Sequence, residues 1–297
     1  MTMALTLGPL QYYWSRTAVL QFYESVTDMP VDIVHLGETV CSRRHELRFD
    51  DWLEVAAMLD AAGKQVVLST QVLIESRQEL ATLERLARHG HYLVEANDMG
   101  AVNVLGGASF VAGPFLNVFN EPVLELLAGH GATRWVMPLE MGRDSLALMQ
   151  AARPPGMQTE VFAYGRMPLA FSARCFTARN RNLPKDNCQY VCMDHPDGLL
   201  LRTREQEPFL VLNGIQTQSA RVYNLIQEVP ELQALGVHSL RISPQSAHTA
   251  DIAQLFRAVL DNRTPPAEAL HTMQALMPAE PCNGYWHGLP GLDLKVA

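Results

Sequence analysis

The sequence predicts an α/β fold, a (β/α)8 barrel of the TIM type with a C-terminal tail. Eight short apolar runs alternate with segments of helical periodicity between residues 31 and 260, and this alternation is typical of a parallel sheet covered by helices. The alternative is an open doubly wound sheet, but no glycine-rich first turn supports it. The pattern therefore favours the closed barrel.

The expected elements follow one another in chain order. The first strand is Val31–Leu36, which ends at Gly37, and the first helix is Asp50–Ala62, which has apolar residues at helical spacing and stops at Gly63. The other expected strands are similar apolar runs: Gln65–Thr70, Tyr92–Glu95, Phe110–Ala112, Arg134–Met137, Glu160–Ala163, Phe209–Leu212 and Ser239–Ile242. The other expected helices are Glu75–His89, Pro122–Ala128, Asp144–Ala152, Ala220–Val229 and Thr249–Leu260.

The length of 297 residues suits one large domain. We expect the barrel to occupy about residues 30–262. The proline-rich segment 263–297, which lacks periodicity, then wraps the barrel. The whole chain 1–297 is thus predicted to be a single domain.

The composition narrows the function classes. A net charge of −8 counts against a nucleic-acid ligand, because phosphate binding needs a positive surface. No secretory signal and no apolar run of about 18 residues occurs, so we expect a cytoplasmic protein that does not span a membrane. In a reducing compartment, five cysteines indicate metal binding, catalysis or burial rather than disulfides.

Three of the five cysteines lie close together in sequence: Cys175, Cys188 and Cys192 follow the sixth expected strand. Cys41 follows the first expected strand. Because loops after barrel strands emerge at the same C-terminal face, these four thiols are placed to converge. Cys282, in the tail, is not placed by this argument.

Four thiolates suit a structural zinc ion or an iron–sulfur cluster, and unrelated buried thiols are the third possibility. Zinc sites usually contain two close pairs of ligands, whereas this chain has one close pair and two distant single cysteines, which favours a cluster. Nearby arginines would offset the charge of a cluster or hold an anionic substrate; they are Arg43, Arg44, Arg174, Arg179 and Arg181. The alternative interpretation is that each of these arginines lies exposed to solvent on a loop.

Other chemistry has little support. The motifs of triad hydrolases, P-loop NTPases and zincins do not occur in the sequence. Glu95, Asp98 and Glu140 lie at expected strand ends, where they suit acid–base chemistry or the capping of a following helix. His35 lies within a strand pattern and is interpreted as packed.

The segment EVFAYGRMPLAFSARC, residues 160–175, resembles the characteristic segment of peptidase family U32, once called collagenase-like peptidases. Further stretches extend the resemblance to about residues 5–290: GPLQYYW, HLGETVCSRR, EANDMG, PKDNCQYVC, VLNGIQT, RISPQ and CNGYW. They resemble the branch of the family that acts in ubiquinone biosynthesis. The family segment usually has a histidine and a further cysteine, which here are Tyr164 and Pro168.

The resemblance implies a [4Fe–4S] cluster on Cys41, Cys175, Cys188 and Cys192, in which Cys41 replaces the lost ligand and Cys282 takes no part. It also implies a heterodimer with a second U32 protein and oxygen-independent hydroxylation of the ubiquinone ring precursor. Prephenate is the oxygen donor associated with the family, and a lipid-carrier protein is a further partner to consider. The alternatives are an RNA-base hydroxylase and a non-catalytic structural subunit; a genuine peptidase is not expected.

Overall fold

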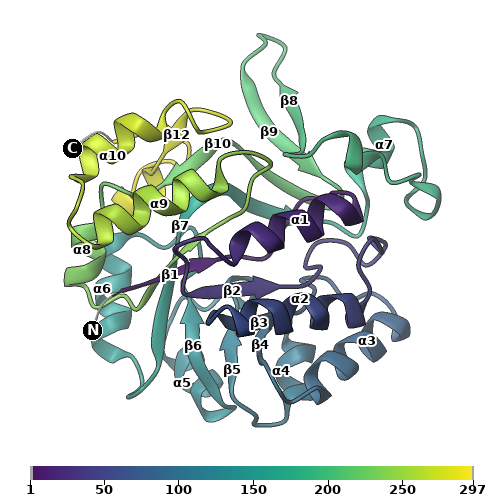
Figure 1. Ribbon diagram of the computed structural model, residues 1–297, viewed down its shortest axis with the longest axis horizontal. Coiled ribbons are helices and arrows are strands. Elements are labelled where there is room, and N and C mark those ends of the chain that lie inside the picture. Colours follow the sequence, from purple (N-terminus) through teal and green to yellow (C-terminus); the bar gives the residue numbers. More distant parts are fainter. Residues whose placement is uncertain (1–2, 296–297) are drawn as a thin grey trace.

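Eight parallel strands close into a barrel in the computed structural model, which describes residues 3–295 (Figure 1). In order around the barrel they are β1 (Ala4–Leu7), β2 (Ile33–Leu36), β3 (Gln65–Ser69), β4 (Leu93–Ala96), β5 (Phe110–Ala112), β6 (Ala132–Val136), β7 (Gln158–Phe171) and β11 (Ser239–Ile242). The pairing of β11 with both β7 and β1 closes the barrel. The predicted α/β barrel is therefore confirmed.

Helices cover the outside of the barrel. They are α1 (Arg16–Val26), α2 (Phe49–Ala61), α3 (Arg77–Arg88), α4 (Met99–Leu105), α5 (Glu121–Gly129), α6 (Arg143–Ala152), α8 (Val229–Ala234) and α9 (Thr249–Leu260). Alternate strand residues such as Leu5, Trp135 and Leu240 face these helices and belong to the main hydrophobic core. The residues between them face the barrel interior, where Ile33 and Val111 belong to a second, small apolar cluster.

Two predictions about the barrel strands need correction: where the barrel begins and where Phe209–Leu212 lies. The first barrel strand is Ala4–Leu7, so the barrel begins near the N-terminus and not at about residue 30. Phe209–Leu212 lies in β9 (Pro208–Asn213), which is antiparallel and outside the barrel. A four-residue strand carries too few side chains to show a pattern, and an apolar run does not reveal which sheet it joins.

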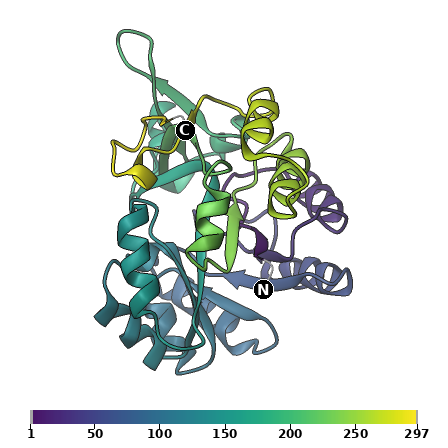
Figure 2. The ribbon, with the colours of Figure 1, turned by 90° about the vertical axis from the view of Figure 1, so that its left-hand side faces the viewer.

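Strand β7 continues past the barrel and carries a small antiparallel extension. Its far half pairs with β10 (Gln216–Asn224), and β9 and β8 (Leu199–Arg202) follow outward. The β8–β9 hairpin projects from the barrel in both views (Figure 1, Figure 2). The chain between β7 and β8, which holds three cysteines, is thereby placed beyond the C-terminal ends of the barrel strands.

The helix predicted over Ala220–Val229 is wrong, because its first half, up to Asn224, belongs to strand β10 and α8 begins only at Val229. Helices α1 and α4 were not predicted. The C-terminal segment holds α10 (Pro266–Met273), β12 (Pro281–Cys282) and a 3₁₀ turn at Gly284–His287. Among residues 3–295, no helix is both long enough and apolar enough to span a bilayer.

Candidate functional site

Four cysteines from separate segments line one small cavity: Cys41, Cys175, Cys188 and Cys192. Cys41 lies in the connection after β2, and the other three lie in the connection after β7. Since β1 precedes them, these are the second and seventh barrel strands rather than the first and sixth. The cavity lies beyond the C-terminal ends of the barrel strands. The role of the four thiols as ligands stays a prediction.

Local backbone geometry positions Cys41. The carboxylate of Glu38 accepts hydrogen bonds from the backbone N–H groups of Val40 and Cys41, at 2.8 and 3.0 Å. Gly37 has a φ of +120°, and a Cβ atom there would lie 2.8 Å from the carbonyl oxygen of Ser69. Only glycine fits this position without displacing the backbone, so the tight turn after β2 depends on it.

The other three cysteines are held by a compact connection. Cys175 caps helix α7 (Phe176–Asn180), and its sulfur accepts a hydrogen bond from the backbone N–H of Ala178 at 3.4 Å. Between Cys188 and Cys192, both Gln189 and Tyr190 have left-handed backbone conformations, with φ of 51° and 54°. These two residues reverse the chain sharply, so both flanking thiols reach the same cavity.

A buried arginine lies beside the thiols. Arg44 lines the cysteine cavity, donates to the backbone carbonyl of Gln11 at 2.6 Å and to Oδ1 of Asn213 at 2.7 Å, and lies 3.6 Å from Glu38. Burial alone would lower the pKa of Arg44, but Glu38 and the sulfurs of Cys192 and Cys41 outweigh it and raise that pKa. The site therefore holds a fixed positive charge next to its sulfur atoms.

Burial controls the ionisation of the thiols themselves. It raises the pKa of Cys41 to about 11, and it raises the pKa of Cys192 despite the opposing effect of Arg44. Burial therefore favours the protonated form of both thiols. A metal centre would have to displace these protons when it binds.

Cys282 lies elsewhere. It belongs to β12, pairs with Tyr223 of β10 and is fully buried. Burial raises the pKa of its thiol to about 12. It is a core residue, apart from the cavity that the other four cysteines line.

The cavity suits an iron–sulfur cluster in the chemistry of its donors. All four thiols are free, and four cysteines are the ligand set of a [4Fe–4S] cluster. Arg44 supplies a positive charge that offsets the negative charge of such a cluster. Within residues 3–295, no three His, Cys, Asp or Glu side chains gather closely enough to hold a single metal ion. The fit therefore rests on the cavity that the four thiols share.

The remaining predicted arginines divide into two groups. Arg43 lines the cysteine cavity and pairs with Asp186 at 2.7 Å. Arg174, Arg179 and Arg181 are exposed on the connection after β7, in agreement with the interpretation that they lie on a solvent-exposed loop. These three arginines therefore face solvent rather than the thiols.

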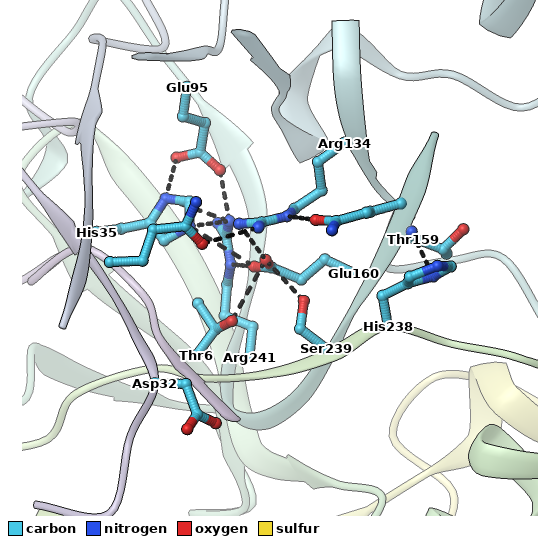
Figure 3. Close-up of polar contacts among 12 residues, drawn as sticks. Thr6, Asp32, His35, Glu95, Arg134, Thr159, Glu160, His238, Ser239 and Arg241 are labelled. Atoms are coloured by element: carbon cyan, nitrogen blue, oxygen red, sulfur yellow. Dashed lines mark hydrogen bonds and ion pairs between the residues drawn. The ribbon is translucent and has the colours of Figure 1, made fainter. Parts of the chain in front are cut away.

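A second polar cluster fills the barrel interior (Figure 3). Arg241 donates to Glu95 at 2.6 Å and also to Glu160, and His35 lies 3.3 Å from Glu95. Arg134 lies 3.7 Å from Glu160. All five side chains are buried and come from five different strands. Glu95, expected at a strand end, is thus enclosed within the barrel together with Arg241, and His35 is packed as interpreted.

The charges inside the barrel stabilise one another. Burial would raise the pKa of Glu95 and of Glu160, but Arg241 outweighs it, with help from His35, and both values lie below the ordinary range. The same carboxylates raise the pKa of Arg241 against the effect of burial. Ion pairs this deep are costly to break, so this cluster is part of the structural core of the barrel.

Other polar residues at predicted strand ends have local roles. Asp98 caps α4 through a hydrogen bond from the N–H of Gly100 at 2.6 Å. Asn213 and Gln216 lie in the β9–β10 hairpin and bind Gln11. This amide network could not be predicted, because Gln11 lies in a segment with no predicted element.

A larger cavity of about 820 Å³ lies next to the cysteine cavity and shares Arg43, Arg44 and Lys185 with it. It is bounded by the ends of β2 and β3 and by helices α2 and α3. Sequence patterns gave no indication of it, because its walls are separate stretches that look like ordinary helix and loop.

Fold and site together define a (β/α)8-barrel protein with a four-thiol cavity beyond the C-terminal ends of its barrel strands. The sequence matches peptidase family U32 over residues 20–291, and the chain belongs to that family. This agrees with the resemblance noted from its motifs.

Among solved structures, a putative dihydrodipicolinate synthetase from Pseudomonas aeruginosa aligns with a TM-score of 0.50 at 9% identity, over 93% of this chain and 82% of that one. N-acetylneuraminate lyase from Mycoplasma synoviae aligns with a TM-score of 0.47 at 10% identity, over 92% and 80%. Dihydropteroate synthase from Thermus thermophilus gives 0.40 at 13%, over 93% and 95%. At 9% identity, the alignment with the Pseudomonas aeruginosa protein shows the fold alone.

Proposed function

We propose that this chain is the iron–sulfur subunit of an oxygen-independent hydroxylase that acts on the ubiquinone ring precursor. In this proposal it corresponds to UbiV and works as a heterodimer with a UbiU-type U32 protein. Prephenate would supply the oxygen atom. Cys41, Cys175, Cys188 and Cys192 would hold a [4Fe–4S] cluster, and that cluster would supply redox chemistry.

One observation carries the proposal: four cysteines from two distant connections line a single cavity beside the buried Arg44. Family membership over residues 20–291 and the motifs around the cysteines support it. Arg44 would stabilise an anionic cluster, because a buried opposite charge interacts strongly at short range.

The test is anaerobic co-expression with the partner, followed by an assay of ring hydroxylation on a prenylated phenol. We expect product only with both subunits and prephenate, and we expect the product oxygen to derive from labelled prephenate. Product that forms without prephenate, or an unlabelled product, would contradict the proposed donor. Full activity in a variant that lacks the cluster would favour a structural subunit instead.

A second candidate, an RNA-base hydroxylase, is favoured by the exposed Arg174, Arg179 and Arg181 on the cysteine-bearing connection. Such a patch would bind phosphate groups. RNA binding that weakens steeply with salt, and that disappears when these arginines become glutamine, would support this candidate. The net charge of −8 opposes it.

A further inference from the structure

The cavity between α2 and α3 is large enough for a small-molecule ligand. Its volume of about 820 Å³ lies within the range of roughly 300–1,000 Å³ that is usual for ligand sites. One of its ends reaches the residues that it shares with the cysteine cavity, Arg43, Arg44 and Lys185. A ligand in this cavity would therefore lie next to the four thiols.

The end near the thiols is polar. Arg43 pairs with Asp186, and Lys185 pairs with Glu75. Ser69 and Thr70, at the end of β3, line the same cavity. The Ser69 hydroxyl donates to Glu95, and the Thr70 hydroxyl accepts from the backbone N–H of Asn97. This end offers hydrogen-bond donors and acceptors to a polar ring substituent, and its paired charges leave no strong excess of either sign.

The end between the helices is mainly apolar, and the guanidinium of Arg85 of α3 lies there over the ring of Phe49. Phe49 and Trp52 of α2 face Leu83 and Leu86 of α3, with Ile74 from the preceding loop. Apolar side chains around an open cavity favour a hydrocarbon ligand, because its burial removes apolar surface from water. A ligand that satisfies both ends has a polar head and a hydrocarbon tail.

The apolar end also reaches the molecular surface. Gln78 and Thr82 of α3 line the cavity and are exposed. Helix α1 packs against α2, and α3 packs against α4. Arg85 of α3 and Asp50 of α2 form an ion pair across the gap between α2 and α3. A hydrocarbon tail longer than the cavity would therefore pass out beside Gln78 and Thr82.

We infer that this cavity binds the prenylated phenol substrate, with the ring at the polar end beside the thiols and the isoprenoid tail between α2 and α3. The inference rests on the proposed function and extends it, because it assigns the reacting substrate to this chain rather than to its partner. The tail leaves beside Gln78 and Thr82 of α3, and the ring stays next to the cysteine cavity.

The test is anaerobic calorimetric titration of the cluster-loaded protein with a phenol that carries three isoprene units. Phenol without a tail is the comparison ligand. In Thr82→Trp, an indole ring replaces a small exposed side chain on the cavity wall. The matched control is Thr272→Trp on α10, because both threonines are exposed and each donates to the carbonyl four residues earlier, at 3.1 Å. Ile74→Glu is a second variant, which places a charge against the tail.

We expect the tailed phenol to bind wild type and Thr272→Trp alike, and to bind Thr82→Trp and Ile74→Glu at least tenfold more weakly with unchanged cluster spectra. Equal binding of the phenol without a tail, or unchanged binding in both cavity variants, would overturn the inference. Hydroxylation by the complex without such binding would refute the inference and leave the proposed function standing. Binding without hydroxylation would support the inference and refute the proposed function.

Discussion

The guanidinium of Arg44 lies 3.6 Å from the carboxylate of Glu38, and both residues belong to the connection after β2 that carries Cys41. Arg44 is also anchored by Gln11 and Asn213. Glu38 in turn binds the backbone N–H of Cys41. One ion pair therefore links the position of a thiol to the position of the buried charge beside it.

This link predicts that Arg44 raises the reduction potential of the proposed cluster. In Arg44→Gln the reduced, more negative cluster loses a nearby cation, so the potential should fall by about 60 mV or more, which is a tenfold change in a one-electron equilibrium. Arg44→Lys keeps the charge and should recover most of the potential. EPR-monitored redox titration measures both. Equal potentials in wild type and Arg44→Gln would show that the charge has no such effect.

Single cysteine substitutions test the ligand set. Alanine at Cys41, Cys175, Cys188 or Cys192 removes one of four thiolates, and we expect each variant to lose most of its iron and sulfide. Cys282→Ala removes a buried thiol outside the cavity and should keep the cluster. Iron and sulfide analysis with visible spectra after anaerobic purification decides this. A fully loaded Cys41→Ala protein would refute the proposed ligand set.

Gly37 should be needed for the geometry of the cysteine cavity. Gly37→Ala adds a Cβ atom 2.8 Å from the Ser69 carbonyl oxygen at a φ of +120°, so both strain and a collision oppose it. We expect a loss of about 1–3 kcal/mol in unfolding free energy and reduced cluster content. Gly63→Ala is the control, since its φ is +80° but no atom lies within 4 Å. It should lose stability and keep the cluster.

The charges inside the barrel should be required for stability. Arg241→Met removes the cation that pairs with both Glu95 and Glu160, and it leaves two buried carboxylates without their main partner. The expected cost is about 3–5 kcal/mol. Urea unfolding followed by circular dichroism measures it. A triple variant that also carries Glu95→Gln and Glu160→Gln should recover part of the loss; no recovery would argue against charge as the cause.

The same carboxylates predict an acid-sensitive barrel. The folded pKa of Glu95 lies below its ordinary value of 4.5, so its contribution to stability is fully present above about pH 4.5 and is lost as pH falls below that value. Wild type should therefore lose stability steeply in this acid range. Glu95→Gln should be less stable at pH 7 but show a shallower acid dependence, as measured by thermal unfolding between pH 3 and 7. Parallel curves for the two proteins would contradict this account.

The sequence revealed the parallel barrel because most of its strands are apolar runs followed by amphipathic helices. It did not reveal Ala4–Leu7, whose four residues are too few for a pattern. Val222, Leu225, Ile226 and Val229 have helical spacing, which produced the wrong helix. In the structure Val222 and Tyr223 are neighbours in β10 and both are buried, so this part of the strand is covered on both faces and lacks the alternation typical of a half-exposed strand.

The part of the candidate site that could be predicted from the sequence is its cysteines, because clustered cysteines are rare. Cysteine clustering identified the thiols, because four cysteines in two connections are unusual in a chain with five. The partners of Arg44 were not visible, since Gln11 and Asn213 lie about 200 residues apart and only the fold brings them together. The α2–α3 cavity was hidden for the same reason.

The two connections that carry the thiols have a consequence for assembly. Cys41 and Cys192 are separated by about 150 residues, which include five of the eight barrel strands, β3 to β7. A group bound by all four thiols would cross-link a very long loop. Folding of the barrel brings the ends of that loop together, so the entropic cost of closing the loop belongs to barrel folding and not to binding of the group. Cofactor insertion would then be the last step of maturation, into a scaffold that already exists. A ribosome would have to synthesise roughly two thirds of the chain before the fourth ligand appears.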